Sequence, residues 1–196
     1  RVYGAVGFLM GRLSVIGFDE KMLAVVESIS HDIIASSEIE GVALNNEEVR
    51  SSVAHQLGVQ LPNQKSSSRY IDVVVKMTLD ATVNYNSPLT SDRIFGWHNC
   101  LFPTGWSGVT KIDVAKYRQG EMRVVSGMFG REKVHYVAPA PEKIDEEMRR
   151  FLSWFNSETQ SGYIKSAIAH LWFVCIHPFD DGNGRIGRAI ADMALS

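Results

Sequence analysis

An apolar helical segment that runs directly into a glycine-rich sequence restricts the fold of this chain more than any other feature. Helical spacing relates the apolar residues of the segment, which are Ile164, Ala167, Ile168, Leu171, Trp172 and Cys175. The sequence HPFDDGNGRIGR follows at 177–188. Because Pro178 disfavours helical backbone at His177, we expect this helix to end there and another to begin near Gly184 or Arg185. The two helices then flank a short loop.

Helical periodicity extends through most of the chain and predicts an all-α fold class. Two predicted helices cover residues 18–34 and 69–84, and another is opened by Asn45 with Glu48 and ends near Gly58. A further helix carries Ile94, Trp97 and Leu101 and stops before Pro103. The last of this set carries Ile144, Met148, Leu152 and Phe155 on one face.

Residues 116–137 interrupt the helical pattern. Gly120, Gly127 and Gly130 separate short runs that contain Val, Phe and Tyr. This pattern predicts a β-hairpin, which is the one small β element expected in the fold.

Composition and charge exclude several classes of partner. The 196 residues carry a formal net charge of −2, so no overall field attracts nucleic acid or an anionic membrane. No apolar run approaches the roughly 18 residues that span a bilayer. Cys100 and Cys175 lack metal-ligand spacing and are expected to be free thiols in a reducing cytosol, with one disulfide as the alternative. The chain lacks an initial Met and stops within a helical pattern, so we interpret it as the core fragment of a cytoplasmic protein.

Residues 182–187 spell GNGRIG, which has the spacing of a dinucleotide-binding fingerprint. That fingerprint requires a preceding strand, a following helix and an acidic residue about 20 positions later. Here the preceding segment has helical periodicity, and only nine residues follow Gly187. We therefore reject a nicotinamide or flavin site of this type.

The same loop still suits phosphate. Gly182 and Gly184 let the backbone approach an anion closely, and the N-terminus of the following helix supplies N–H groups. Arg185 and Arg188 lie three residues apart on one helix face, and guanidinium groups pair well with phosphate oxygens. No Lys-Ser or Lys-Thr pair follows the glycines, so the segment is not a P-loop.

Two further residue types complete the candidate site. Asp180 and Asp181 offer hard oxygen ligands, and Mg²⁺ typically binds one or two carboxylates together with phosphates. His177 is a candidate general base. Each of these residues alone is more often structural, because a His before Pro commonly ends a helix and paired Asp residues commonly form a turn. Their concentration in one short segment favours a functional site.

The segment HPFDDGNGRIGR matches the signature HPFx(D/E)GNGRxxR of Fic-domain proteins at every specified position, so the chain resembles that family. The resemblance implies a Fic-type helical bundle that uses ATP as substrate together with Mg²⁺. It also implies protein adenylyltransferase activity, the transfer of AMP to a Ser, Thr or Tyr hydroxyl of a target protein. The N-terminal sequence resembles the extension of many bacterial members of the family. The resemblance therefore implies an N-terminal helical extension over 1–60, which contains the inhibitory helix, and a Fic core domain over 61–196.

The resemblance assigns roles to individual residues. His177 would deprotonate the target hydroxyl, and Asp181 would hold Mg²⁺. The other motif residues would bind the phosphates, with Arg188 at the γ-phosphate; they are Gly182, Asn183, Gly184, Arg185 and Arg188. Phe179 would be a core anchor whose presence favours nucleotide transfer over phosphate transfer.

The resemblance also gives the predicted hairpin a role. It would be a flap that aligns a target segment by strand addition. The residues concerned are Val125, Ser126, Gly127, Met128 and Phe129. An ordinary hairpin that covers the core is the alternative.

A second match lies upstream, at SSEIEG (36–41). Ser36 and Glu40 fit the inhibitory pattern of the family, in which Ser or Thr is followed by three residues, a Glu, and then Gly or Asn. The resemblance implies that Glu40 pairs with Arg188, occupies the γ-phosphate site and keeps the enzyme inactive. An exposed Glu at a helix end is the alternative.

Three functions stay open at this point. The first is an AMP transferase inhibited by Glu40. The second is the reverse reaction, in which Glu40 orients a water that hydrolyses AMP from a modified protein. The third is a regulatory module that only senses ATP. The chain ends eight residues after Arg188, where the pocket of the family usually continues, so the nucleotide base stays open too.

The expected partner is a target protein that bears a hydroxyl side chain. A homodimer through the helical surface around Trp97 and Leu101 is one interpretation of that apolar pair, and core packing is the other. Neither nucleic acid nor a membrane is indicated as a partner.

Overall fold

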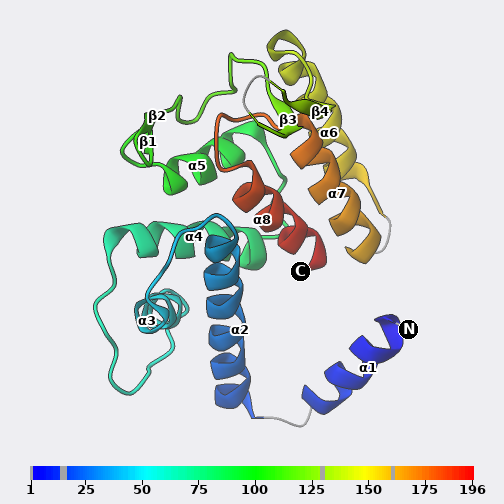
Figure 1. The fold of residues 1–196 in the computed structure, drawn as a ribbon. Helices are drawn as coiled ribbons and strands as arrows, with labels where there is room; N and C mark the ends of the chain where they lie inside the picture. The colour runs from blue at the N-terminus through cyan, green and yellow to red at the C-terminus, as the bar shows by residue number, and fades with distance from the viewer. Residues whose placement is uncertain (1, 14–16, 129–130, 160–161) are drawn as a thin grey trace. The chain divides into compact units, whose positions relative to one another are not determined.

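The computed structural model describes residues 2–13, 17–128, 131–159 and 162–196 (Figure 1). Within these ranges the chain forms eight α-helices, one short 3₁₀ turn and two two-stranded sheets. It divides into two compact units, residues 1–75 and 76–196, with the boundary inside α4 (Arg69–Val83). The predicted mostly helical fold with a small β-hairpin is confirmed, and a second, shorter hairpin accompanies it.

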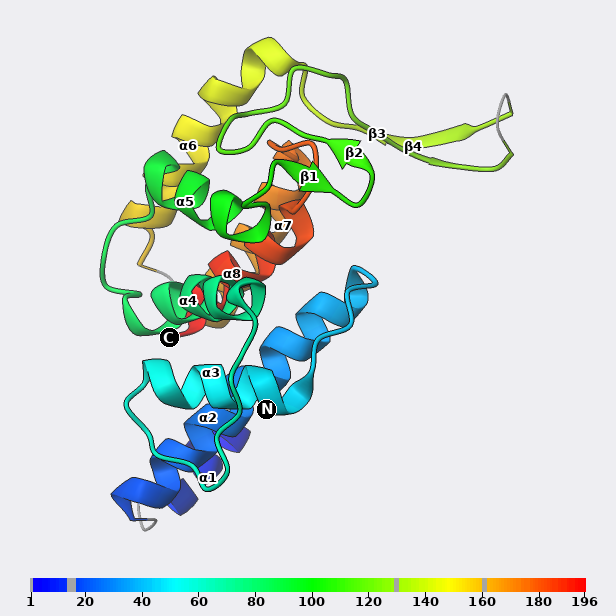
Figure 2. The same ribbon diagram turned by 90° about the vertical axis from the view of Figure 1, so that its left-hand side faces the viewer.

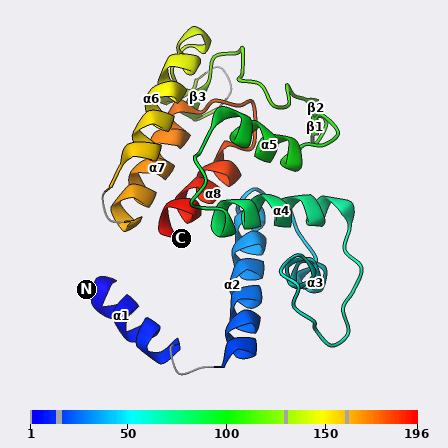
Figure 3. The same ribbon diagram turned by 180° about the vertical axis from the view of Figure 1, so that it is seen from behind.

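The first unit contains α1 (Val2–Leu13), α2 (Phe18–Ile39), α3 (Asn46–Gln56) and the start of α4 (Figure 3). Helix α2 packs against α3, and each contributes buried aliphatic side chains. The Asn45 side chain caps α3 by accepting hydrogen bonds from the backbone N–H groups of Glu47 (3.0 Å) and Glu48 (3.1 Å). The predicted start of this helix is confirmed. Helix α1 was not predicted, because its three glycines weaken the helical signal.

The second unit is a bundle around α7 (Gly162–Ile176) and α8 (Asn183–Leu195), which pack against each other. Helix α6 (Ile144–Ser157) packs on α7, and α5 (Ser91–Leu101) contacts α8. A Cβ at Gly187 would lie 3.1 Å from both His170 Cδ2 and Val174 Cγ2. The last glycine of GNGRIG therefore serves the close approach of α7 and α8, since a side chain there would separate them.

Two hairpins lie between α5 and α6. Strand β1 (Trp106–Ser107) pairs with β2 (Thr110–Lys111), and β3 (Arg123–Ser126) pairs with β4 (Lys133–Val137), both antiparallel. Figure 2 shows β3 and β4 extending away from the helices of their unit. The hairpin predicted within 116–137 is confirmed. The first hairpin was missed, since two-residue strands are too short for an alternating pattern.

Trp97 and Leu101 are each only 3% exposed. The Trp97 indole Nε1–H donates to Asp80 Oδ2 (2.8 Å), and Arg93 Nε donates to the same oxygen (2.7 Å). Of the two interpretations of this pair, core packing is therefore correct, and a dimer surface built on these side chains is not.

Two expectations from composition are also answered. Cys100 and Cys175 are free thiols, and both are half-buried. Within the described residues, no helix combines the length and apolar character needed to cross a bilayer.

Candidate active site

The motif 177–188 forms the end of α7, a tight loop and the first turns of α8. Helix α7 ends at Ile176 as Pro178 predicts, and His177 follows in a left-handed conformation with φ +51°. Gly182 caps α8 with φ +83°. Helix α8 begins at Asn183, one residue before the expected start. The sequence thus places a histidine at one end of the loop and a helix N-terminus at the other.

Asn183 holds the loop from inside. Its Oδ1 accepts the backbone N–H of Phe179 (3.0 Å) and its Nδ2 donates to the Phe179 carbonyl (2.8 Å). The side chain is 2% exposed. Both amide atoms of the Asn183 side chain therefore bond to the Phe179 backbone. The contact of Asn183 with phosphates stays a prediction.

His98, which the sequence analysis did not single out, supports the loop from α5. Its Nδ1 accepts the backbone N–H of Ala115 (3.0 Å), so Nε2 carries the proton and donates to the Asp181 carbonyl (3.1 Å). The fully buried ring stacks on Phe179 with centroids 4.2 Å apart. Burial lowers the pKa of His98, so the imidazole is neutral at pH 7. The ring has a structural role, because it packs between Phe179 and the backbone of Ala115 and Asp181.

His177 has the properties of a general base. It is half-buried, and burial is the main reason that its pKa lies below the ordinary histidine value. Its Nδ1 lies 3.3 Å from the Val174 carbonyl. Because a carbonyl only accepts, Nδ1 carries the proton and Nε2 holds the lone pair. A neutral imidazole with a free lone pair on Nε2 can take a proton from a substrate hydroxyl.

The cationic side of the site comes from α8. Arg185 is 7% exposed; its guanidinium lies 4.9 Å from the Phe102 ring centroid and 3.9 Å from Asp181 Oδ1. Arg188 is half-buried and lies near His170, whose pKa is lowered by burial and then by the charge of Arg188. Together with the positive end of the α8 dipole, these charges favour an anion at this end of the helix.

Asp181 is the carboxylate that sequence analysis assigned to a metal. Its Oδ1 accepts the Gly182 backbone N–H (2.5 Å), and its Oδ2 accepts the Ser107 hydroxyl from β1. The side chain is 38% exposed and so can reach a cation. No group of three metal-ligating side chains occurs in the described part of the chain. This donor set fits Mg²⁺, which takes one or two carboxylates plus phosphate oxygens, rather than an ion that needs an all-protein cage.

The flap residues lie on the β3–β4 hairpin. Val125 and Met128 are 47% and 74% exposed, Ser126 ends β3, and Gly127 has φ +110°. Phe129 lies outside the described residues. The register of the β3–β4 pair shifts between Val124 and Val125. Such an irregularity bends the strand and increases its local twist. The residues of β3 and β4 are all exposed.

Ser36 and Glu40 belong to the first unit, at the end of α2. Glu40 is the C-cap, Gly41 has φ +72°, and Val42 N–H donates to the Ser37 carbonyl (3.0 Å) while Gly41 N–H donates to the Glu38 carbonyl (2.9 Å). These bonds form a Schellman motif, which requires a left-handed residue directly after the C-cap. Gly or Asn after the Glu is therefore explained by helix termination.

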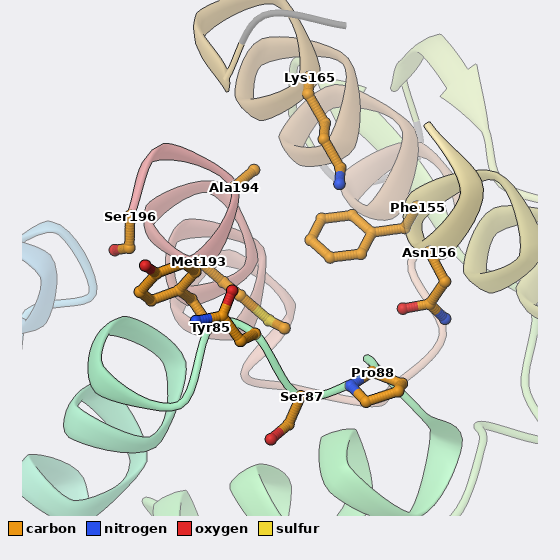
Figure 4. Close-up of a pocket in the computed structure, with 10 residues that line it drawn as sticks. Tyr85, Ser87, Pro88, Phe155, Asn156, Lys165, Met193, Ala194 and Ser196 are labelled. Atoms are coloured by element: carbon orange, nitrogen blue, oxygen red, sulfur yellow. The ribbon is translucent and has the colours of Figure 1, made fainter. Parts of the chain in front are cut away.

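A separate pocket of about 390 Å³ lies at the other end of α8 (Figure 4). Tyr85, Phe155, Lys165 and Met193 line it, and Lys165 Nζ lies 4.5 Å from the Phe155 ring centroid. Since a helix rises about 1.5 Å per residue, Met193 is on the order of 15 Å along α8 from the motif loop. This pocket is distinct from the candidate active site.

Gly182 gives a direct test of the loop geometry. A Cβ there would lie 2.8 Å from Phe102 Cε2 and 3.3 Å from Leu101 Cδ1, and φ is +83°. In Gly182→Ala, the left-handed backbone of an alanine costs about 1–2 kcal/mol. Overpacking of its methyl group against Phe102 and Leu101 costs about 1–3 kcal/mol more. We expect Gly182→Ala to lower the free energy of unfolding by roughly 2–5 kcal/mol, measured by urea denaturation.

Gly96→Ala is the matched control for that substitution. Gly96 is exposed within α5, and a Cβ there would meet nothing within 4 Å. This change is expected to stabilise the protein by about 0.5–1 kcal/mol. Equal stability of Gly182→Ala and wild type would contradict the described loop.

A mostly helical fold with a neutral histidine beside a cationic helix N-terminus defines a protein suited to phosphate chemistry. Residues 88–195, more than half of the chain, match the family model of the Fic/DOC family, and the chain belongs to that family. Residues 1–59 match a domain of unknown function, DUF4172.

Individual relatives agree with this assignment. The chain is 32% identical over 117 residues to a uridine 5'-monophosphate transferase of Xanthomonas campestris pv. campestris (strain 8004), covering 56% of this chain and 21% of that protein. It is 38% identical over 78 residues to a protein adenylyltransferase Fic of Drosophila willistoni, covering 37% of this chain and 16% of that protein. A solved Fic family protein from Desulfovibrio desulfuricans G20 has a TM-score of 0.64 at 26% identity, covering 98% of this chain and 55% of that one. The chain spans at most about a fifth of these two curated relatives and about half of the solved one.

Proposed function

We propose that this chain transfers AMP from ATP to a Ser, Thr or Tyr hydroxyl of a target protein. The observation that carries the proposal is His177, a half-buried histidine with a lowered pKa, one tight loop away from the N-terminus of α8. The names of the two curated relatives, a protein adenylyltransferase and a uridine 5'-monophosphate transferase, support transfer of a nucleoside monophosphate.

In the proposed reaction, His177 Nε2 accepts the proton of the target hydroxyl while the hydroxyl oxygen forms a bond to the α-phosphorus of ATP. The bond from the α-phosphorus to the oxygen that bridges to the β-phosphate breaks. Pyrophosphate leaves with that electron pair, and AMP stays on the target oxygen. General base catalysis of this kind contributes about 10²–10⁴ in rate.

The remaining motif residues hold the nucleotide in this proposal. The backbone at Gly182, Asn183 and Gly184 binds phosphate oxygens, and Arg185 and Arg188 supply positive charge, with Arg188 at the γ-phosphate. Asp181 would hold Mg²⁺, which when bound neutralises phosphate charge. The exposed β3–β4 edge, from Val125 to Met128, aligns the target segment by strand addition.

We further propose that Glu40 inhibits the enzyme by pairing with Arg188, so that the γ-phosphate loses its partner and bound ATP is turned away from the hydroxyl. Ser36 lies one helical turn before Glu40 on α2. The match of 36–41 to the inhibitory pattern supports this regulation. Glu40 itself is the C-cap of α2.

The test uses ATP labelled at either the α- or the γ-phosphate, incubated with a cell extract and with wild-type or Glu40→Gly protein. Label from the α-position alone, attached to protein and stronger in Glu40→Gly, is the expected result. Label from the γ-position would instead identify phosphate transfer and contradict the proposal. Repeating the assay with α-labelled UTP decides the base, since one relative is named as a uridine 5'-monophosphate transferase.

Two other functions give different results in the same experiment. Release of AMP from α-labelled protein by wild type, lost in Glu40→Gly, would identify a hydrolase that removes AMP. Tight ATP binding without transfer by either form would identify an ATP-sensing module.

A further inference from the structure

Arg118 is the most deeply buried charged side chain among those described, and neither the motif nor the flap includes it. It lies between β2 and β3 and is 1% exposed. Burial lowers its pKa, and a buried guanidinium is costly unless its N–H groups are all bonded. The reason for keeping a cation at this position is found in the groups that it joins.

Arg118 donates to five backbone carbonyls. Its side chain reaches the carbonyls of Gly120 through Nη1 (2.6 Å), Pro139 through Nη2 (2.7 Å), His177 through Nε (2.7 Å) and Ile176 through Nη2 (3.4 Å). Its backbone N–H donates to the Pro178 carbonyl (2.9 Å). One residue therefore serves two segments that lie far apart in the sequence.

The first segment is the base of the β3–β4 hairpin. Gly120 precedes β3 and Pro139 follows β4, so the two outer guanidinium nitrogens hold both ends of the hairpin. The Tyr136 hydroxyl on β4 also donates to the Cys175 carbonyl near the end of α7 (2.8 Å). The hairpin is thus attached to the end of α7 at two places.

The second segment is the start of the motif loop, where His177 adopts φ +51°. Left-handed backbone costs a non-glycine residue roughly 1–2 kcal/mol, so surrounding contacts must hold it. The His177 N–H donates to the Phe173 carbonyl (3.0 Å). Arg118 donates to the His177 carbonyl through Nε and to the Pro178 carbonyl through its backbone N–H. Arg118 therefore bonds to the two carbonyls that flank the His177 Cα, those of Ile176 and His177.

We propose that Arg118 is a positioning residue that holds the general base and the target-docking hairpin in one fixed geometry. The inference rests on the proposed function, because it assigns a purpose to joining His177 with the flap. Lysine cannot replace Arg118 in this role, since a single ammonium cannot span carbonyls on both sides.

The test compares Arg118→Lys with the matched control Arg93→Lys, each made alone and in the Glu40→Gly protein. The Arg93 side chain is 12% exposed and donates to the Asp80 carboxylate and to the backbone carbonyls of Ser87 and Asp80, and none of these acceptors belongs to the motif 177–188. Three measurements are made: the histidine titration of His177 by NMR, hydrogen exchange of the β3–β4 amides, and kcat and KM for ATP with α-label on protein.

We expect Arg118→Lys to shift the His177 titration, speed exchange in β3 and β4 by at least about tenfold, and lower kcat by about 10–100-fold with little change in KM for ATP. Arg93→Lys is expected to lower the melting temperature without these changes. An unchanged His177 titration and unchanged hairpin exchange in folded Arg118→Lys would overturn the inference. The first two measurements need no transfer activity, so they separate this inference from failure of the proposed function.

Discussion

Replacing Glu40 with glycine is expected to raise AMP transfer by roughly 10- to 100-fold. The proposed pair would occupy Arg188, and a charge-assisted hydrogen bond to the γ-phosphate is worth about 1.5–3 kcal/mol. Each 1.36 kcal/mol changes a rate by about tenfold, so regaining that bond accounts for the range. Glycine should fold normally there, because Glu40 is the C-cap of α2 and not an interior helical residue. Initial rates with α-labelled ATP measure the effect.

Two variants isolate the carboxylate as the cause. Glu40→Gln removes only the charge and is expected to activate nearly as much as Glu40→Gly. Glu38→Gly disturbs the last turn of the same helix but keeps Glu40, and the transfer rate is expected to stay at the wild-type level. Equal rates in wild type and Glu40→Gly would remove self-inhibition from the proposal.

The local features of the active site could be predicted from the sequence, because each follows from one residue and its neighbours. Pro178 ended α7 where expected, and the glycines opened a helix at 183. The hairpin within 116–137 followed from its glycines and β-branched residues. Short-range backbone preferences act on adjacent positions, so they can be read directly from the sequence.

The residues that hold the motif loop could not be found in this way. His98 and Arg118 act on backbone atoms 83 and 59 positions away, and a hydrogen bond to a carbonyl requires no particular side chain on the acceptor. No pattern in the sequence therefore marks the partners. The bonds between the Asn183 amide and the Phe179 backbone also leave no mark in the sequence, because an amide can pair with an anion or with a buried backbone pair.

Removing the imidazole of His177 is expected to lower AMP transfer by about 10²–10⁴-fold, the usual contribution of a general base. Asparagine is the better replacement, because it tolerates the φ of +51° at this position and cannot accept the proton as a base. His177→Asn, made in the Glu40→Gly protein, should therefore fold and bind ATP while transferring little AMP. His55→Ala, at an exposed histidine on α3, is the control and should retain full activity.

The pH dependence of the rate identifies the imidazole as the base. Burial lowers the pKa of His177 below 6.5, and only the neutral form can accept a proton. The rate is therefore expected to be constant above about pH 7 and to fall as the pH drops through the lowered pKa. His177→Asn should lose this acid limb together with the rate. If His177→Asn retained more than about a tenth of the activity, the loss would be smaller than the smallest general-base effect expected. That result would show that another group accepts the proton.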